Sequence, residues 1–176
     1  MTLYDIIGKT YTKTRRSDPR IAEKLLEILS PLQASTVVAD IGAGTGSYAH
    51  VLAEHGCHVF AVEPSATMRN QAIYHPAIEW REGYAESLPL PDQAVDVAII
   101  MLAIHHCSDY QQALSEIHRV VGNGQIVFFT YDPTMISSFW LTDTNSLKYR
   151  DNKWQVIGEL RCLPLLSSTL LNLQSS

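Results

Sequence analysis

The chain lacks the marks of several common functional classes. No apolar run reaches the ~18 residues of a membrane-spanning helix, and the first ten residues contain no apolar segment of the signal-peptide kind. Its formal net charge of −5 leaves no basic surface for general nucleic-acid binding. Only three cysteines occur, without the spacing of a disulfide framework or a metal site: Cys57, Cys107 and Cys162. These absences predict a soluble, cytoplasmic protein with free thiols and no metal, which binds neither membranes nor nucleic acid.

The residues that are present predict one globular domain built on a buried sheet. Hydrophobic residues make up 46% of the 176 positions and charged residues 18%, which is typical of a folded domain with its own core. Several short apolar segments show no strict alternation, as expected of strands that are covered on both faces. They are Thr36–Ile41, His58–Val62, Val95–Ile100, Gln125–Thr130 and, less clearly, Ile78–Glu82.

Helical patterns alternate with these strands. Asp18 and Pro19 are typical of a helix start, and Ser30-Pro31 stops the apolar stripe that follows. Further helices are predicted at Tyr48–His55, at Ser65–Ala72 and from a cap at Ser108 to about Val121. The order β-α-β-α-β-β-α-β predicts an α/β fold, namely a Rossmann-like, doubly wound, mostly parallel sheet.

The pattern changes toward the C-terminus. From about Thr142 the turn and strand signals weaken, and one further strand is predicted near Trp154–Leu160. We therefore expect a ligand-binding domain over residues 1–141, followed by an atypical C-terminal segment of the same domain over residues 142–176.

A glycine loop preceded by an acid is the strongest functional signal. The apolar strand ends at Asp40, and three alternate glycines follow at Gly42, Gly44 and Gly46. Such a loop lets bare backbone approach a ligand closely, because glycine has no Cβ and tolerates positive φ. A carboxylate beside it suits an ammonium group and repels a pyrophosphate, which favours S-adenosylmethionine (SAM) over a dinucleotide. A tight turn without a ligand, with Asp40 as its cap, stays open as an alternative.

The dinucleotide fingerprint is the nearest rival interpretation. It requires the spacing G-x-G-x-x-G and an acid about 20 residues further on. Ser47 stands where the third glycine belongs, whereas Glu63 lies 21 residues after Gly42. An acid there can bind a ribose diol in either cofactor class, so Glu63 predicts an adenosine ligand without choosing between them. A nicotinamide-dependent oxidoreductase therefore remains an alternative, which Asp40 and Ser47 disfavour.

Several spaced motifs together resemble the class I SAM-dependent methyltransferases, specifically the ubiquinone/menaquinone-biosynthesis-like branch (methyltransferase type 11). Asp40–Gly46 resembles the first motif of that family. The other matching segments are Tyr4–Gly8 with Tyr11, Asp18–Ile21, Val62–Ser65 with Met68, Gly83–Pro89 with Asp92, Asp96–Ala98 and Leu114–Val120. The resemblance runs from about Tyr4 to Thr134.

This resemblance implies a set of cofactor-binding residues. They are Asp40, Gly42, Ala43, Gly44, Gly46, Glu63, Pro64, Met68, Ala85, Glu86 and Met101. It implies that Asp40 holds the methionyl ammonium, directly or through water, that Glu63 binds the ribose hydroxyls, and that Met68 packs near the adenine. Ala85 would donate its backbone N–H to an adenine ring nitrogen. Because Tyr84 stands where many relatives have aspartate, the exocyclic amine is left to Glu86 or to water.

No clear catalytic constellation is visible. His105 and His106 follow the fourth predicted strand, at the edge where open α/β sheets bind ligands, and either is a candidate base. A structural role for them is equally open. Met101 would line the methyl-transfer site, and Glu116 and Arg119 are expected to be surface or packing residues.

We expect SAM-dependent methyl transfer to a small-molecule acceptor, which the sequence does not identify. The tail departs from the family, whose complete domains close the sheet with a further helix and an antiparallel hairpin, whereas only 43 residues follow Pro133. We therefore expect incomplete C-terminal edge strands and homo-oligomers formed through that edge. A truncated methyltransferase that binds SAM without turnover is the alternative.

Overall fold

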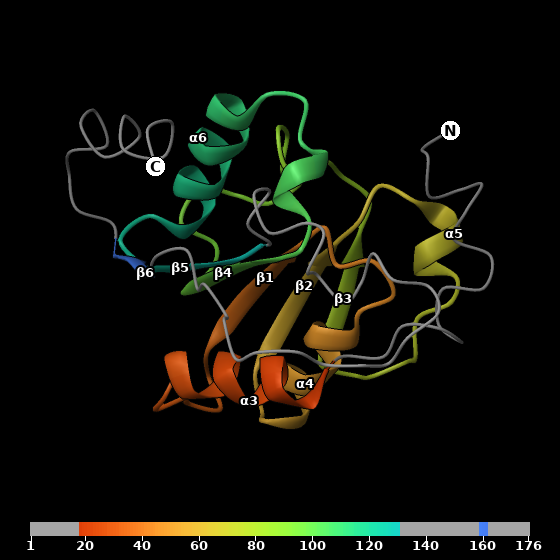
Figure 1. Cartoon of the computed structure of the whole chain (residues 1–176), viewed down its shortest axis with the longest axis vertical. Coiled ribbons are helices and arrows are strands. Elements are labelled where there is room, and N and C mark those ends of the chain that lie inside the picture. Colours follow the sequence, from red (N-terminus) through yellow and green to blue (C-terminus); the bar gives the residue numbers. More distant parts are fainter. Residues whose placement is uncertain (1–17, 131–158, 162–176) are drawn as a thin grey trace, which may run out of the picture.

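A six-stranded sheet forms the centre of the protein (Figure 1). The computed structural model describes residues 18–130 and 159–161. The strands lie in the order β3-β2-β1-β4-β5-β6. Their bounds are β1 Val37–Ile41, β2 His58–Val62, β3 Ile78–Arg81, β4 Val97–Met101, β5 Gln125–Phe129 and β6 Glu159–Arg161. The first five are parallel, and β6 is antiparallel to β5, which confirms the predicted doubly wound, mostly parallel sheet.

Helices cover both faces of the sheet. The helices are α3 Pro19–Ile28, α4 Ser47–Glu54, α5 Ala66–Arg69 and α6 Tyr110–Val121, with a 3₁₀ turn η2 at Ile104–His106. Figure 1 shows α3 and α4 below the sheet and α6 above it. One buried cluster joins α3 and α4 to the sheet through residues such as Leu25, Leu52 and Ile99. A second joins α6 to the opposite face through Ile117 and Ile100. Burial on both faces explains why the strands are apolar without alternating.

Local sequence signals fix the helix starts. The Asp18 side chain accepts the Arg20 N–H at 3.0 Å and caps α3, as predicted. In α6 the cap is Asp109, whose side chain accepts the Gln112 N–H at 3.0 Å, and the expectation of Ser108 was wrong. The reason is tertiary, because the Ser108 hydroxyl donates to Glu86 at 2.9 Å instead.

Other element boundaries differ modestly from the predictions. The fourth strand begins at Val97 instead of Val95, and the fifth ends at Phe129. The helix expected at Ser65–Ala72 is a single α-helical turn, Ala66–Arg69. In the described residues no helix is long and apolar enough to cross a membrane.

The strand β6 covers part of the sheet edge that was expected to be open. Its three residues pair with the first three residues of β5, with Val127 opposite Glu159 and Gln125 opposite Arg161. The first half of β5 therefore has a neighbour within the chain, which reduces the edge available to a second copy. The remainder of the strand predicted at Trp154–Leu160, and most of residues 142–176, lie outside the described residues, as does the N-terminal segment with Tyr4 and Tyr11.

Packing of α6 on the sheet should contribute strongly to the free energy of unfolding. Ile117 has no exposed surface, so Ile117→Ala should lower the free energy of unfolding by about 2–5 kcal/mol through lost burial and a cavity. Gln111 lies on the same helix and is exposed, so Gln111→Ala should change it by less than about 0.5 kcal/mol. Urea denaturation of both variants measures the difference. Equal effects would show that α6 is not packed as described.

Candidate functional site

The carboxyl ends of β1 and β2 bring the glycine loop and two acids together. Asp40 pairs in register with Ala61 of β2 and Ile99 of β4. Just beyond β1, the backbone N–H groups of Gly42 and Ala43 both donate to the Val62 carbonyl, at 2.9 and 3.1 Å. The loop is thus tied across the end of β2, which is the edge where open α/β sheets bind ligands.

The three glycines are required for different reasons. All have positive φ, between 60° and 80°. A Cβ on Gly42 would lie 2.4 Å from the Ala103 Cβ, and one on Gly46 would lie 2.8 Å from the Trp80 ring. A Cβ on Gly44 would meet only the Met68 methyl group, at an ordinary 3.5 Å. Protein neighbours therefore exclude side chains at Gly42 and Gly46, whereas Gly44 has room for a Cβ in ordinary contact with Met68.

Glu63 joins the glycine loop to the next turn. Its carboxylate accepts the Gly44 N–H at 2.9 Å through Oε2 and the Ser65 N–H at 2.8 Å through Oε1. The side chain is 6% exposed. Each carboxylate oxygen has two lone pairs and can accept more than one donor. Glu63 is therefore a structural clamp as well as the predicted ribose acceptor.

Asp40 is a buried carboxylate with an unsatisfied atom. It is 1% exposed, and its Oδ2 has no hydrogen-bond partner among the described residues. Burial raises its pKa to about 7, the Ala49 backbone N–H opposes that shift, and the nearby charge of Glu63 adds to it. A buried unpaired oxygen is costly and calls for a partner. A cation or a bridging water at this position would satisfy it.

The turn after β2 supplies the wall next to Gly44. Pro64 follows Glu63 directly, and the Ser65 side chain caps α5 by accepting the Met68 N–H at 3.3 Å. Met68 is 3% exposed. Arg69 donates to the Glu63 carbonyl and to Glu82, which fixes α5 against the ends of β2 and β3. Met68 therefore lies beside the loop, and the cofactor contacts expected of Pro64 and Met68 remain predictions.

A tight turn presents Ala85. The Ser87 N–H donates to the Tyr84 carbonyl at 3.1 Å, which makes residues 84–87 a β-turn with Ala85 at its second position. No described residue accepts a hydrogen bond from the Ala85 N–H. That donor is available to a ligand. The Tyr84 side chain is exposed.

Glu86 makes contacts that sequence reasoning did not foresee. Its Oε1 accepts the Ser108 N–H at 2.6 Å, the Ser108 hydroxyl at 2.9 Å and the Asp109 N–H at 3.3 Å. Desolvation raises the pKa of Glu86, but these donors outweigh it and hold the pKa below its ordinary value. In this structure the carboxylate is directed at the entry of α6. Its expected contact with an exocyclic amine remains an untested prediction.

The end of β4 carries the remaining predicted residues. Met101 is the last residue of β4, and Leu102 after it has a φ of 56°, a left-handed conformation that is unusual for leucine. Strained backbone of this kind gathers at functional sites, and sequence gave no signal for it. His105 and His106 lie in η2 with ring centroids 4.0 Å apart. Burial lowers the pKa of both, and the neighbouring His106 lowers that of His105 further.

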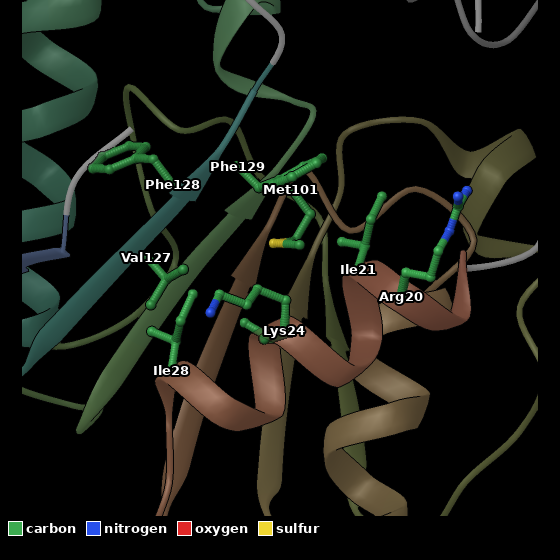
Figure 2. Close-up of a pocket in the computed structure, with 9 residues that line it drawn as sticks. Arg20, Ile21, Lys24, Ile28, Met101, Val127, Phe128 and Phe129 are labelled. Carbon is green, nitrogen blue, oxygen red and sulfur yellow. The ribbon is translucent and has the colours of Figure 1, made fainter. Parts of the chain in front are cut away.

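Met101 also borders a cavity of about 290 Å³ between α3 and the strands β4 and β5 (Figure 2). Its other walls are mainly apolar and include Ile21, Val127 and Phe129. Lys24 also lines it, and its ammonium is paired with Glu27 at 2.9 Å. The cavity therefore presents an apolar surface next to Met101.

Comparison with known proteins identifies the family. A family model described as a methyltransferase domain matches residues 39–129, just over half of the chain. A ubiquinone/menaquinone biosynthesis C-methyltransferase of Rubrivivax gelatinosus is 39% identical over 94 residues, which are 52% of this chain and 38% of that protein. A malonyl-[acyl-carrier protein] O-methyltransferase of Pectobacterium atrosepticum is 34% identical over 108 residues, 61% of this chain and 42% of the relative.

Solved structures agree with these matches. A crystal structure from Anabaena variabilis, described as a methyltransferase of an antibiotic biosynthesis pathway, is 48% identical with a TM-score of 0.65. The match covers 69% of this chain and 49% of that chain. The chain thus spans less than half the length of these relatives. The stretch matched to the family contains Asp40, the glycine loop and Glu63, and the chain belongs to the class I SAM-dependent methyltransferases.

Proposed function

We propose that this chain binds SAM at the carboxyl edge of its sheet and transfers the methyl group to a small-molecule acceptor. The observation that carries the proposal is the enclosed Asp40 Oδ2, which has no partner among the described residues, next to a glycine loop that has room for a Cβ at Gly44. Family membership gives no support to the nicotinamide-dependent alternative. Equilibrium binding of SAM or S-adenosylhomocysteine (SAH), measured against NADH, tests the cofactor assignment.

The described residues fit the parts of SAM in turn. Asp40 would pair with the methionyl ammonium. Because its side chain is enclosed, that contact would run through a bridging water molecule. Gly44 would allow backbone to lie against the ligand, and Glu63 would accept the ribose hydroxyls. Met68 would pack on the adenine, and the unpaired N–H of Ala85 would donate to a ring nitrogen. The Asp40 Oδ2 lacks a hydrogen-bond partner among the described residues, which supports the first of these assignments.

The proposed chemistry asks mainly for alignment. When bound, SAM supplies an electrophilic methyl group on a sulfonium whose departure leaves a neutral thioether. The chain's part is to orient the acceptor in line with the methyl–sulfur bond and to exclude water from it. The buried residues near Met101 suit the exclusion of water. A base is needed only for an acceptor that arrives protonated. The lowered pKa values of His105 and His106 keep their imidazoles neutral near pH 7, so either can accept that proton.

The acceptor is proposed only as a class. The two curated relatives are named for methylation at carbon and at oxygen, so their names do not agree on the atom that receives the methyl group. The apolar cavity beside Met101 favours an acceptor with an apolar portion. Transfer of radiolabelled methyl groups into metabolite extracts, run beside SAH binding, distinguishes an active enzyme from a protein that binds without turnover. The cytoplasmic location and the homo-oligomer remain predictions.

The two acids are expected to bind different parts of the ligand, so their substitutions should have different effects. Asp40→Asn should weaken SAH binding roughly tenfold and leave adenosine binding unchanged, since adenosine has no ammonium. Glu63→Gln should weaken both, because both carry the ribose. Glu54→Gln, an exposed acid on α4, is the matched control and should change neither. Titration calorimetry measures all three, and wild-type affinities in both acid variants would refute the site.

SAH binding should depend on pH through Asp40. Its raised pKa of about 7 means that the free protein holds this carboxyl protonated at lower pH, whereas an ammonium ligand favours the ionised form. Binding then releases a proton, so affinity should rise with pH and level off above about 7. We expect roughly tenfold weaker binding at pH 5.5 than at pH 7.5. Asp40→Asn should remove this dependence, and a wild-type affinity that is flat with pH would contradict the assignment.

Gly44→Ala should separate ligand contact from folding. The added Cβ meets no close protein atom, so the variant should fold at a cost of about 1–2 kcal/mol for its positive φ. SAH affinity should fall at least about tenfold, because the methyl group occupies ligand space. Gly42→Ala is the comparison, since its Cβ would overlap Ala103 and should unfold the loop itself. A folded Gly44→Ala variant that binds like wild type would show that the loop does not hold the cofactor.

A further inference from the structure

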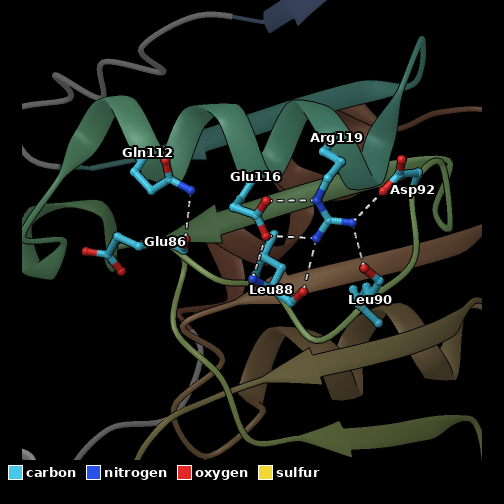
Figure 3. Close-up of polar contacts among 7 residues, drawn as sticks. All are labelled: Glu86, Leu88, Leu90, Asp92, Gln112, Glu116 and Arg119. Atoms are coloured by element: carbon cyan, nitrogen blue, oxygen red, sulfur yellow. Dashed lines mark hydrogen bonds and ion pairs between the residues drawn. The ribbon is translucent and has the colours of Figure 1, made fainter.

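A polar face of α6 holds the backbone of the segment that follows Ala85 (Figure 3). Gln112, Glu116 and Arg119 are spaced i, i+4, i+7 and so lie on one side of the helix. Gln112 Nε2 donates to the Glu86 carbonyl at 3.2 Å, and Glu116 Oε2 accepts the Leu88 N–H at 2.9 Å. The helix therefore contacts main-chain groups of the 86–90 segment, which side-chain substitutions in that segment would leave in place.

Arg119 is the centre of this arrangement. Its Nε and Nη2 donate to the two oxygens of Glu116, both at 2.8 Å. Nη2 also donates to the Leu88 carbonyl at 3.1 Å, and Nη1 donates to the Leu90 carbonyl at 2.9 Å and to Asp92 Oδ1 at 2.8 Å. A guanidinium has five N–H donors, and these five bonds use all of them. Lysine could not reproduce this planar set.

Side-chain packing also holds the segment. The Leu88 and Leu90 side chains are 5% and 6% exposed and pack in the same buried cluster as Ile117. Pro89 lies against Gly83, where a Cβ would come within 2.6 Å of the proline ring. Residues 88 and 90 thus face the core while their carbonyls face Arg119. Both the carbonyls and the side chains of this segment are therefore in contact with neighbouring residues.

We propose that Arg119 is a positioning residue that sets base discrimination at the cofactor site by holding the Ala85 N–H in place. The inference rests on the proposed SAM function. Adenine offers an acceptor at its N1 atom, whereas hypoxanthine carries a proton there and would oppose the Ala85 donor. A site built around a fixed donor rejects a ligand that cannot accept from it. Release of the 86–90 segment frees the donor and weakens that rejection.

The test compares SAH with S-inosylhomocysteine, its deaminated analogue, by titration calorimetry on the full chain. Wild type should prefer SAH, and Arg119→Gln should reduce that preference roughly tenfold. Arg119→Lys should reduce it as well, because a single ammonium cannot span Glu116 and both carbonyls. Asp92→Asn is the matched control, since Asp92 is 75% exposed and its loss leaves the carbonyl bonds intact. Its preference should equal that of wild type.

The outcomes separate a positioning role from a structural one. Arg119 variants that melt at lower temperature yet keep the wild-type preference would overturn the inference, as would Arg119→Gln and Arg119→Lys both failing to fold. A wild type that binds both ligands equally would overturn it too. A wild type that binds neither SAH nor SAM would overturn the proposed function itself, and the inference with it. A reduced preference in the Arg119 variants alone supports it.

Discussion

The hydrogen bonds that the buried Glu63 carboxylate accepts hold the site together. By accepting from Gly44 and Ser65, this one side chain ties the loop after β1 to the turn after β2. The tie requires a loop whose backbone can approach a carboxylate, and hence glycine at positive φ. It also places a second charge beside Asp40, whose pKa burial has already raised to about 7. Two acids enclosed this closely favour a ligand that brings a positive charge and hydroxyl donors.

The geometry accounts for the absence of an evident catalytic constellation. In the proposed reaction, transfer of the methyl group breaks its bond to the sulfonium sulfur and releases a neutral thioether. Such a step depends on alignment more than on acid–base chemistry. Hydrogen bonds hold the backbone near the site at several points, such as the Ser65 cap of α5 and the Gly44 N–H bond to Glu63. His105 and His106 add two imidazoles with lowered pKa values at the same edge.

Segments distant in sequence supply part of that rigidity. The Ala85 turn and α6 are separated by the whole of β4, yet the polar face of α6 holds the backbone that leaves the turn. Glu116 and Arg119 were expected to be surface or packing residues, and the structure makes them the anchors of this segment. No sequence pattern could show it, because their partners are main-chain carbonyls, which every residue has.

The sequence by itself determined the fold class, the order of elements and the motif proposed to bind the cofactor, because these depend on local composition: apolar strands, helix caps and glycine spacing. Asp40, the glycine loop and Glu63 were recognisable because their spacing along the chain is the signal. Only the tertiary structure decided that Glu86 turns to α6, that Asp109 and not Ser108 caps that helix, and that Leu102 is strained. Each of these depends on which groups meet across the sheet edge, and on which buried donors and acceptors must then be satisfied.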